Sequence, residues 1–489
     1  MHVRLRPLAL ALAVALATAL PAAPARDAAP GKLAPRLAER LAGSRTAERH
    51  VAWVFLRDKA PVDAARWAEA AAWVTPRALQ RRARRGETPG VGVADLALAP
   101  AQLEAVRVAV VRVRHVSRWL NAVSVEATAG QIEALARLPF VERLDLVTRG
   151  RRAPEPPAPA GATALSAPPA RAASASAIDY GASLAQLAPL RVPEAHDLGF
   201  DGSGVVVALL DGGFDTLAHE SLAPVRVAAA HDFVSGDDDV GDGADRREVI
   251  HGTAVLSSIG GFRPGQLVGP AYGATYLLAR TEYGGSETPV EEDNWTAAAE
   301  WAEALGADII STSLGYRTFD PGFGGYSAAQ MDGDTAVSTR AADLAVDHGI
   351  VVLASAGNAG PGVTTIGAPA DGHAVLAIGA VDFAGNQAGF SSVGPTADLR
   401  TKPDLVAPGV SVRVATSDTV DGYRTASGTS FACPLAAGVA ALVLQAHPEY
   451  TVAQVHAVLR STARRVGPPD NLTGWGHVDA LAAVTAPAP

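Results

Sequence analysis

Beyond residue 180, short and wholly apolar runs alternate with longer segments in which apolar residues recur at helical spacing. The apolar runs predict buried strands over residues 205–210, 274–279, 308–313, 350–354 and 374–380. The helical spacing predicts helices over residues 295–305, 338–346, 431–446 and 452–462. Strands and helices that alternate in this way form an α/β domain whose mainly parallel sheet is covered on both faces. We therefore expect a three-layer domain over residues 179–485, followed by a short tail at 486–489.

The first part of the chain follows a different order. Strand patterns occupy residues 50–56, 108–115, 122–127 and 140–147, and helical patterns occupy residues 101–107 and 130–138. Together they give the order β-α-β-β-α-β, which is the ferredoxin-like arrangement. Residues 26–149 are therefore expected to form a separate, small α+β domain.

A segment without apolar periodicity separates the two predicted domains. Residues 150–178 are rich in proline, alanine and small polar residues, which predicts an exposed linker. Proteases cut exposed linkers preferentially. The basic pair Arg151 and Arg152 is a candidate cleavage signal of low specificity.

The chain begins with the pattern of a secretory signal peptide over residues 1–25. Arg4 and Arg6 precede an apolar run at residues 8–20, and small residues follow at Ala23, Pro24 and Ala25. The alternative is a retained membrane anchor, but the run is shorter than the roughly 20 residues that span a bilayer. No later stretch reaches that length and hydropathy, so we predict a secreted protein without a membrane span.

Composition and charge narrow the choice of partners. With 48% hydrophobic and 19% charged residues the chain suits a globular protein, and its single cysteine permits neither an internal disulfide nor a cysteine metal cluster. Residues 1–175 carry 26 Lys and Arg against 14 Asp and Glu, whereas the remainder carries 15 against 36. The two parts should attract each other. Nucleic-acid binding is the alternative for a basic region, but no clustered basic motif with stacking aromatics is present, so we predict none.

Three segments place a residue with catalytic chemistry beside glycines. Asp211 follows a predicted strand in VVVALLDGGFD, His251 opens a helical segment in HGTAVLSSIGG, and Ser430 stands at the entrance of the helix in SGTSFACPLAAGVAAL. Nucleophilic hydrolysis needs a hydroxyl, an imidazole that takes its proton and a carboxylate that orients the imidazole. The three residues supply these groups.

The order Asp, His, Ser along the chain and several further motifs carry a family resemblance. The segments STSLG at 311–315, ASAGNAG at 354–360 and TKPDLVAPG at 401–409 stand in the order expected for that family. On these motifs the region from about 180 to 480 resembles the subtilisin-like serine proteases, or subtilases. The resemblance implies a subtilisin-like three-layer α/β domain and a secreted serine endopeptidase.

The resemblance also implies roles for individual residues. Asp211, His251 and Ser430 would form the catalytic triad, and Asn358 with the backbone N–H of Ser430 would form the oxyanion hole. The residues expected to bind the substrate are Ser313, Leu314, Gly315, Ala356, Gly357 and Gly367. Gly367 would lie at the base of the S1 pocket, which implies a bulky hydrophobic or broad preference at P1. The alternative is that Gly367 serves only a turn.

A ferredoxin-like unit in front of such a domain resembles the subtilase propeptide. By that resemblance, residues 26–149 would act as an intramolecular inhibitor and folding aid. The enzyme would be made as a zymogen and remove this domain autocatalytically before acting on protein or peptide substrates.

Some features stay open at this stage. The acidic run at residues 235–248 either binds a structural Ca²⁺ or is a solvated loop, and no metal ligand is assigned. The resemblance implies that the chemistry needs no cofactor. The insertion at 316–339 is either a rim over the substrate cleft, with Tyr326 among its contact residues, or a passive loop. Cys433 is expected to be a buried hydrophobe rather than a second nucleophile.

Two rival functions remain. A catalytically silent subtilase fold could serve as a binding module, although the predicted triad is intact. An esterase or lipase also transfers an acyl group to serine, but that class presents its serine in G-x-S-x-G, whereas Ser430 stands in GTSFA.

Overall fold

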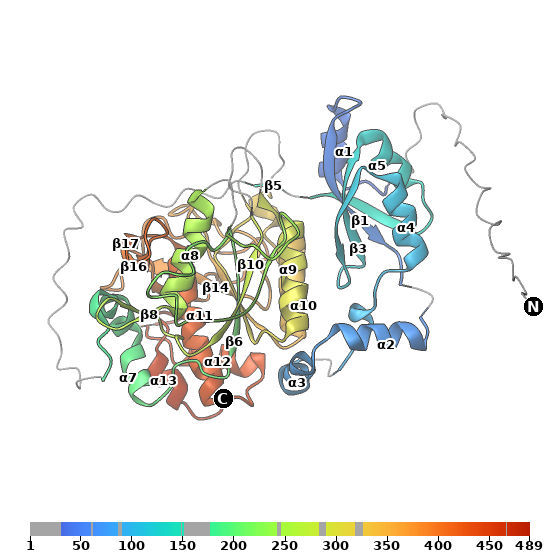
Figure 1. Cartoon of the computed structure of the whole chain (residues 1–489). Coiled ribbons are helices and arrows are strands. Elements are labelled where there is room, and N and C mark those ends of the chain that lie inside the picture. Colours follow the sequence, from blue (N-terminus) through green and yellow to red (C-terminus); the bar gives the residue numbers. More distant parts are fainter. Residues whose placement is uncertain are drawn as a thin grey trace, which may run out of the picture.

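The computed structural model describes residues 31–59, 62–86, 90–147, 149–150, 177–241, 246–282, 290–317, 326–465 and 467–489. The predicted signal peptide at 1–25 and nearly all of the predicted linker, with Arg151 and Arg152, lie outside the described residues. Figure 1 shows a large domain that contains the C-terminus beside a smaller N-terminal domain.

The large domain is built on a seven-stranded sheet in the order β15-β14-β13-β12-β6-β10-β7. Every neighbouring pair of these strands is parallel. The strands are β6 (Val206–Asp211), β7 (Arg226–Asp232), β10 (Thr275–Arg280), β12 (Ile309–Thr312), β13 (Val351–Ser355), β14 (Leu376–Val381) and β15 (Leu405–Pro408). The parallel sheet confirms the predicted α/β class, and β7 and β15 are strands that the apolar pattern missed.

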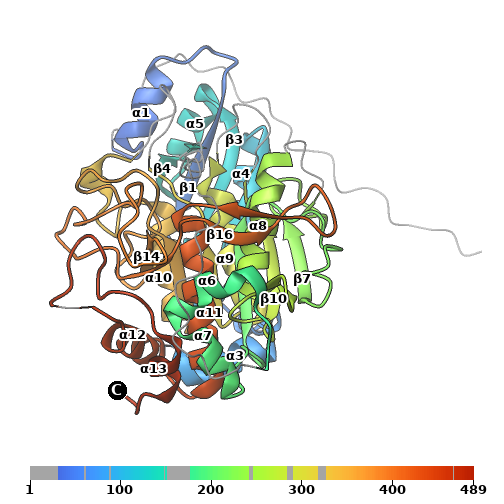
Figure 2. The same ribbon diagram turned by 90° about the vertical axis from the view of Figure 1, so that its left-hand side faces the viewer.

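Helices cover both faces of this sheet, as the prediction required. The main ones are α8 (Arg246–Gly260), α9 (Glu292–Leu305), α10 (Val337–Asp347), α11 (Thr429–Ala446) and α12 (Val452–Ser461). In Figures 1 and 2, α8 and α11 lie on one face and α9 and α10 on the other. Successive residues of β6 alternate between the two cores, with Val207 in the core of α8 and α11 and Ala208 in the core of α9 and α10. Because both faces are buried, the strand reads as a continuous apolar run.

Shorter elements complete the large domain. They are α6 (Leu184–Leu187), α7 (Val192–Asp197), β8 (Phe262–Arg263), β9 (Leu267–Val268), β11 (Val290–Glu291), β16 (Val412–Ala415), β17 (Tyr423–Ala426) and α13 (Ala480–Thr485).

Among the helices in the described residues, α11 is long and apolar enough to cross a membrane, so the expectation that no later stretch reaches that length and hydropathy was wrong. Within the domain, 89% of that stretch is buried. Its composition is that of a central core helix, which is apolar all round.

The small domain has the predicted ferredoxin-like order. Its antiparallel sheet runs β2-β3-β1-β4. The elements are α1 (Pro35–Ala42), β1 (Arg49–Leu56), α4 (Pro100–Ala109), β2 (Arg112–Ser117), β3 (Ala122–Thr128), α5 (Ala129–Ala136) and β4 (Val141–Leu146). One face of the sheet packs on α1, α4 and α5. On the other face, Trp53 and Phe55 form a core with Val337 of the large domain.

The insertion between β1 and α4 was not predicted. It contains α2 (Ala64–Trp73) and α3 (Pro76–Arg85). Figure 1 shows α3 at the lower right of the large domain, away from the small sheet. The N–H of Thr75 donates to the carbonyl of Ala304 at 2.9 Å, so the start of this helix is fastened to the large domain.

Candidate active site

Asp211 is the last residue of a central strand of the large sheet. It ends β6 and is fully buried. Its Oδ1 accepts hydrogen bonds from the N–H of Gly212 at 2.8 Å and from Nδ1 of His251 at 2.6 Å. The carboxylate therefore lies at the carboxyl edge of the sheet, where ligands of such folds bind.

His251 lies on α8 with its ring 2% exposed. The helix begins at Arg246, so the expectation that His251 opens the helix was wrong by five residues. Because Nδ1 is bonded to the Asp211 carboxylate, it carries the proton of the neutral ring and Nε2 is left as an acceptor. Within the described residues, Nε2 of His251 has no hydrogen-bond partner.

Ser430 is the second residue of α11 and is buried. Its Oγ donates to the carbonyl of Ser313 at 3.2 Å. The next residue, Phe431, packs on the His251 ring with a centroid distance of 5.5 Å. The structure therefore brings the three predicted residues to one edge of the sheet from β6, α8 and α11.

The backbone of Ser430 has an unusual partner because of a proline. The residue four positions on, which would normally donate to the Ser430 carbonyl, is Pro434 and lacks an N–H. Instead, the Oγ of Ser313 donates to this carbonyl at 2.8 Å. Ser313 and Ser430 thus hold each other through two hydrogen bonds.

Asn358 stands in the loop after β13 with its amide orientation fixed. Its Oδ1 accepts from both the N–H and the Oγ1 of Thr429, each at 3.0 Å. The Nδ2 group therefore points the other way. A Cβ placed on Gly428 would lie 3.6 Å from Nδ2 of Asn358 and 3.7 Å from the nitrogen of Ser430. The two predicted oxyanion donors border the same space.

The predicted substrate-binding residues line two segments near Ser430. Ser313 and Leu314 are buried, whereas Gly315 is exposed and a Cβ on it would meet no atom within 4 Å. Ala356 is buried, and Gly357 takes a left-handed φ of +106° while its N–H donates to Thr429 Oγ1 at 3.2 Å. The space beside Gly315 is therefore open.

Gly367 lies against the chain that follows Gly315. An added Cβ would find Arg317 Cβ at 3.6 Å, which is ordinary contact, and the φ of Gly367 lies outside the left-handed region. Neither backbone strain nor crowding therefore demands a glycine there. Sequence reasoning missed Arg317, whose Nη1 donates to the carbonyl of Ile366 at 3.3 Å. Burial lowers the pKa of Arg317.

The features left open by the sequence are partly resolved. Asp237 and Asp239 accept loop N–H groups, and Asp238 contacts His231, while Asp242 and Asp245 lie outside the described residues. The described part of the chain contains no group of three or more His, Cys, Asp or Glu residues able to hold a metal ion.

Two further side chains lie in the interior. Burial raises the pKa of the Cys433 thiol to about 12, so the thiol stays protonated. Tyr326 is also buried, and its hydroxyl donates to Glu292 at 2.7 Å rather than facing a cleft, so its suggested substrate contact was wrong. Phe319 and Phe323, which belong to the same insertion, lie outside the described residues.

The end of the small domain reaches the same edge of the sheet. The backbone of β5 (Arg149–Gly150) pairs antiparallel with β11. Strand β11 follows the carboxyl end of β10, whose last residue, Arg280, stands in register with Asp211. The arrangement can thus hold an extended peptide beside a hydroxyl, an imidazole and two convergent N–H donors, which is the equipment for acyl transfer.

Comparison with known proteins agrees with this chemistry. The model of the subtilase family matches residues 202–476, and that of the peptidase S8 propeptide domain of Bacteroidota matches residues 51–158. Subtilisin NAT of Bacillus subtilis subsp. natto is 35% identical over 301 residues, which cover 60% of this chain and 68% of the relative. The subtilisin of Bacillus pumilus is 35% identical over 303 residues, which cover 60% of this chain and 94% of the relative.

A solved structure resembles almost the whole fold. The crystal structure of fervidolysin from Fervidobacterium pennivorans, described as a keratinolytic enzyme related to subtilisin, superposes with a TM-score of 0.62 at 22% identity. The match covers 90% of this chain but only 62% of that one. At this identity the likeness establishes the fold alone.

Proposed function

The chain belongs to the subtilase family of serine endopeptidases and carries a propeptide domain, and on that premise we propose that Asp211, His251 and Ser430 are its catalytic triad. One observation carries the proposal. The 2.6 Å hydrogen bond from His251 to the buried Asp211 leaves Nε2 as an acceptor, on a ring that packs against the residue next to Ser430.

The proposed chemical roles are those of an Asp-His-Ser triad. Ser430 Oγ attacks the scissile carbonyl while Nε2 of His251 takes its proton, and the imidazolium then donates this proton to the leaving amine. Asp211 holds the ring in the required tautomer and stabilises its positive charge. Water then attacks the acyl-enzyme while Nε2 of His251 takes its proton. The imidazolium returns this proton to Ser430 Oγ as the ester bond breaks.

The negative charge that develops on the carbonyl oxygen needs donors. Asn358 Nδ2 and the backbone N–H of Ser430 are proposed to supply them, because both border the space above Gly428. The N–H groups at the start of α11 lack intrahelical acceptors, and the helix dipole favours negative charge there. Thr429 preorganises Asn358 by occupying its Oδ1.

We propose that the substrate binds as an added strand along Ser313, Leu314 and Gly315, because Gly315 is exposed and has open space beside it. Ala356, Gly357 and Gly367 would form the S1 wall, with a bulky hydrophobic or broad preference at P1. A P1 library that includes acidic residues also tests whether Arg317 influences this choice.

The small domain is proposed to inhibit the enzyme until it is cut away. Two sets of contacts support this role: the pairing of β5 with β11 at the carboxyl edge, and a polar interface with the start of α9. In that interface Arg114 and Ser124 donate to Asp293 at 2.8 and 2.6 Å. Burial alone would raise the pKa of Asp293, but Arg114 and His115 outweigh it and lower the pKa.

We propose the boundaries 1–25 for the signal peptide, 26–149 for the propeptide, 150–178 for the linker and 179–485 for the protease domain. Secretion follows from the proposed signal peptide. Metal analysis of the purified protein tests whether the acidic loop 235–248 holds a structural Ca²⁺.

The decisive experiment compares wild-type and Ser430→Ala chains by intact mass and activity on a peptide anilide and a short ester. We expect wild-type protein to process itself near residue 150 and to cleave the anilide, whereas Ser430→Ala stays full-length and inactive. Identical processing in both would show that maturation is not autocatalytic. An inactive wild type would favour the silent binding module, and turnover of the ester alone would favour the esterase.

A further inference from the structure

Helix α3 of the propeptide insertion buries arginines in the large domain. The relative exposure of Arg81 is 3%, that of Arg82 is 1% and that of Arg85 is 8%. A buried guanidinium destabilises a structure unless carboxylates and carbonyls satisfy it. The partners of these arginines therefore define a site.

The first carboxylate of the site is Glu303 on α9. Arg81 Nη2 donates to Oε1 of Glu303, and Arg82 donates through Nε to Oε1 at 2.8 Å and through Nη2 to Oε2 at 2.7 Å. Arg81 also donates to the carbonyls of Ala307 at 2.7 Å and His348 at 3.2 Å. The side-chain hydrogen bonds that Arg81 makes within the described residues all end on the large domain.

The second carboxylate is Asp308, immediately before β12. Arg77 donates to its Oδ2 at 2.5 Å and Arg85 to its Oδ1 at 2.6 Å. Oδ2 also accepts the N–H of Val206 at 3.0 Å, so the carboxylate is built into the start of β6. Because Arg77, Arg81 and Arg85 are four residues apart, they share one face of the helix.

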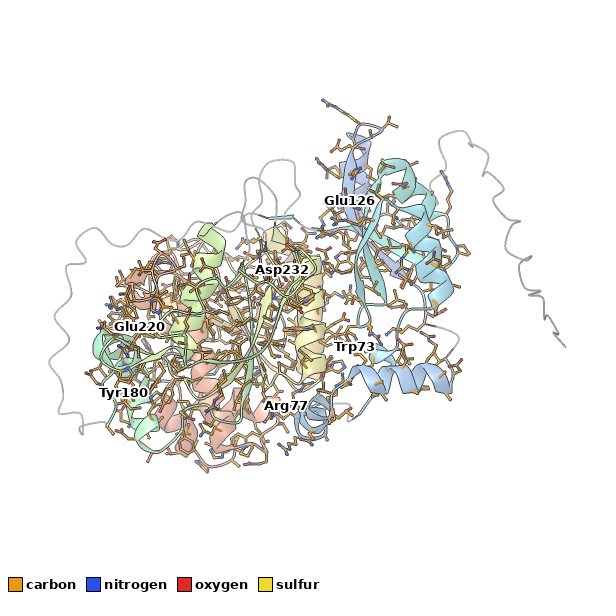
Figure 3. All side chains as sticks on the ribbon, in the orientation of Figure 1. Trp73, Arg77, Glu126, Tyr180, Glu220 and Asp232 are labelled. Carbon is orange, nitrogen blue, oxygen red and sulfur yellow. The ribbon has the colours of Figure 1, made fainter. Side chains whose placement is uncertain are left out.

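This site is remote from the candidate active site. Arg77 donates to the carbonyl of Gly204, just before β6 begins, whereas Asp211 ends the same strand. At about 3.3 Å per residue the two ends of β6, five residues apart, are about 17 Å apart. Figure 3 labels Arg77 where α3 meets the underside of the large domain.

We propose that Glu303, Asp308 and the surrounding carbonyls form a guanidinium-binding exosite whose occupant is α3, a helix with arginines at positions i, i+4, i+5 and i+8. The proposal rests on the proposed removal of the propeptide. Within the described residues, the side chains of Glu303 and Asp308 have no cationic hydrogen-bond partners besides these arginines. After cleavage at the cleft, the exosite keeps the inhibitor at a high effective concentration. The rate at which α3 is released, rather than the rate of cleavage alone, then determines how fast peptidase activity appears.

Arg81→Gln tests the exosite with Arg84→Gln as matched control, because Arg84 lies on the same helix but is exposed. Each full-length chain is allowed to process itself, and dissociation of the cut propeptide is followed by gel filtration and by gain of peptidase activity. We expect Arg81→Gln to release the propeptide about 30-fold faster or more, since breaking a buried charge pair acts on the dissociation rate. Arg84→Gln should match wild type. Equal release rates in all three proteins would overturn the proposal.

A second measurement needs no catalysis. In full-length Ser430→Ala protein, Glu303→Gln should speed amide exchange across α3 about 30-fold or more while β1 keeps its protection. Unchanged exchange in α3 would overturn the exosite even if the enzyme matures as proposed. Faster exchange in α3, together with a wild-type chain that does not process itself, would support the exosite and count against the proposed maturation instead.

Discussion

The mutual hold of Ser313 and Ser430 makes Ser313→Ala a sharp test of how the candidate nucleophile is positioned. The substitution removes the 2.8 Å hydrogen bond to the buried Ser430 carbonyl, and Pro434 cannot replace it because it has no N–H. An unsatisfied buried acceptor costs about 1–3 kcal/mol. Ser313→Ala should therefore lower the free energy of unfolding by that amount.

Two comparisons isolate this cause. Pro434→Ala restores an N–H four residues after Ser430, so Ser313→Ala should cost less in that background, with a coupling of about 1 kcal/mol. Ser258→Ala is the control, because Ser258 Oγ also donates to a helix carbonyl, that of Val255 at 2.8 Å, but the next turn of α8 still supplies an N–H to that carbonyl.

The assay is denaturant unfolding of full-length chains that also carry Ser430→Ala, which prevents autolysis and leaves the backbone carbonyl in place. We expect Ser313→Ala to lower the free energy of unfolding more than Ser258→Ala does. The loss caused by Ser313→Ala should be smaller when Pro434→Ala is also present. Equal losses for both serines, with no coupling to Pro434, would refute the reasoning.

Three further predictions concern turnover, specificity and pH. Asn358→Ala should lower kcat on a peptide anilide by about 10²–10³-fold, the effect known for the corresponding donor of subtilisin, and a wild-type kcat would contradict its assignment. Gly367→Val should lower kcat/KM for P1 Phe by about tenfold or more and leave P1 Ala nearly unchanged; equal losses would refute the pocket. Glu300 of α9 lies buried under the propeptide, where Ser117 Oγ and the N–H of Arg118 donate to it. Burial raises the pKa of Glu300 from 4.5 to about 7, so the docked complex holds an extra proton and release of the propeptide should quicken as pH rises through this range. The ratio of wild-type to Glu300→Gln release rates isolates this effect from His115, whose lowered pKa acts oppositely, and a ratio independent of pH would contradict it.

Much of the fold could be predicted because local pattern and tertiary burial agree. Strands such as β6 are buried on both faces and therefore read as apolar runs, and the order of strands and helices then implies the layers. Edge strand β7 escaped prediction because its sequence RVAAAHD has no apolar run, and only its last residue is buried. Asp211, His251 and Ser430 could be singled out as candidates because glycines accompany them in short sequence motifs.

Helix α3 shows where local pattern fails. Its segment PRALQRRARR is strongly polar and lacks an apolar stripe, because its burial depends on Glu303, 222 residues away from Arg81. The charge imbalance predicted that the two parts of the chain attract each other. It did not predict which residues make the ion pairs. Arg317 was missed for a similar reason, since only the fold places it beside Gly367.

The central claim is that Ser430 is the nucleophile activated by His251. Its most direct test is labelling of the purified wild-type enzyme with a serine-directed phosphonate, followed by peptide mapping. The account predicts one adduct, on Ser430, which is lost when His251 is replaced by Ala. An adduct on another serine, or undiminished labelling without His251, would contradict it.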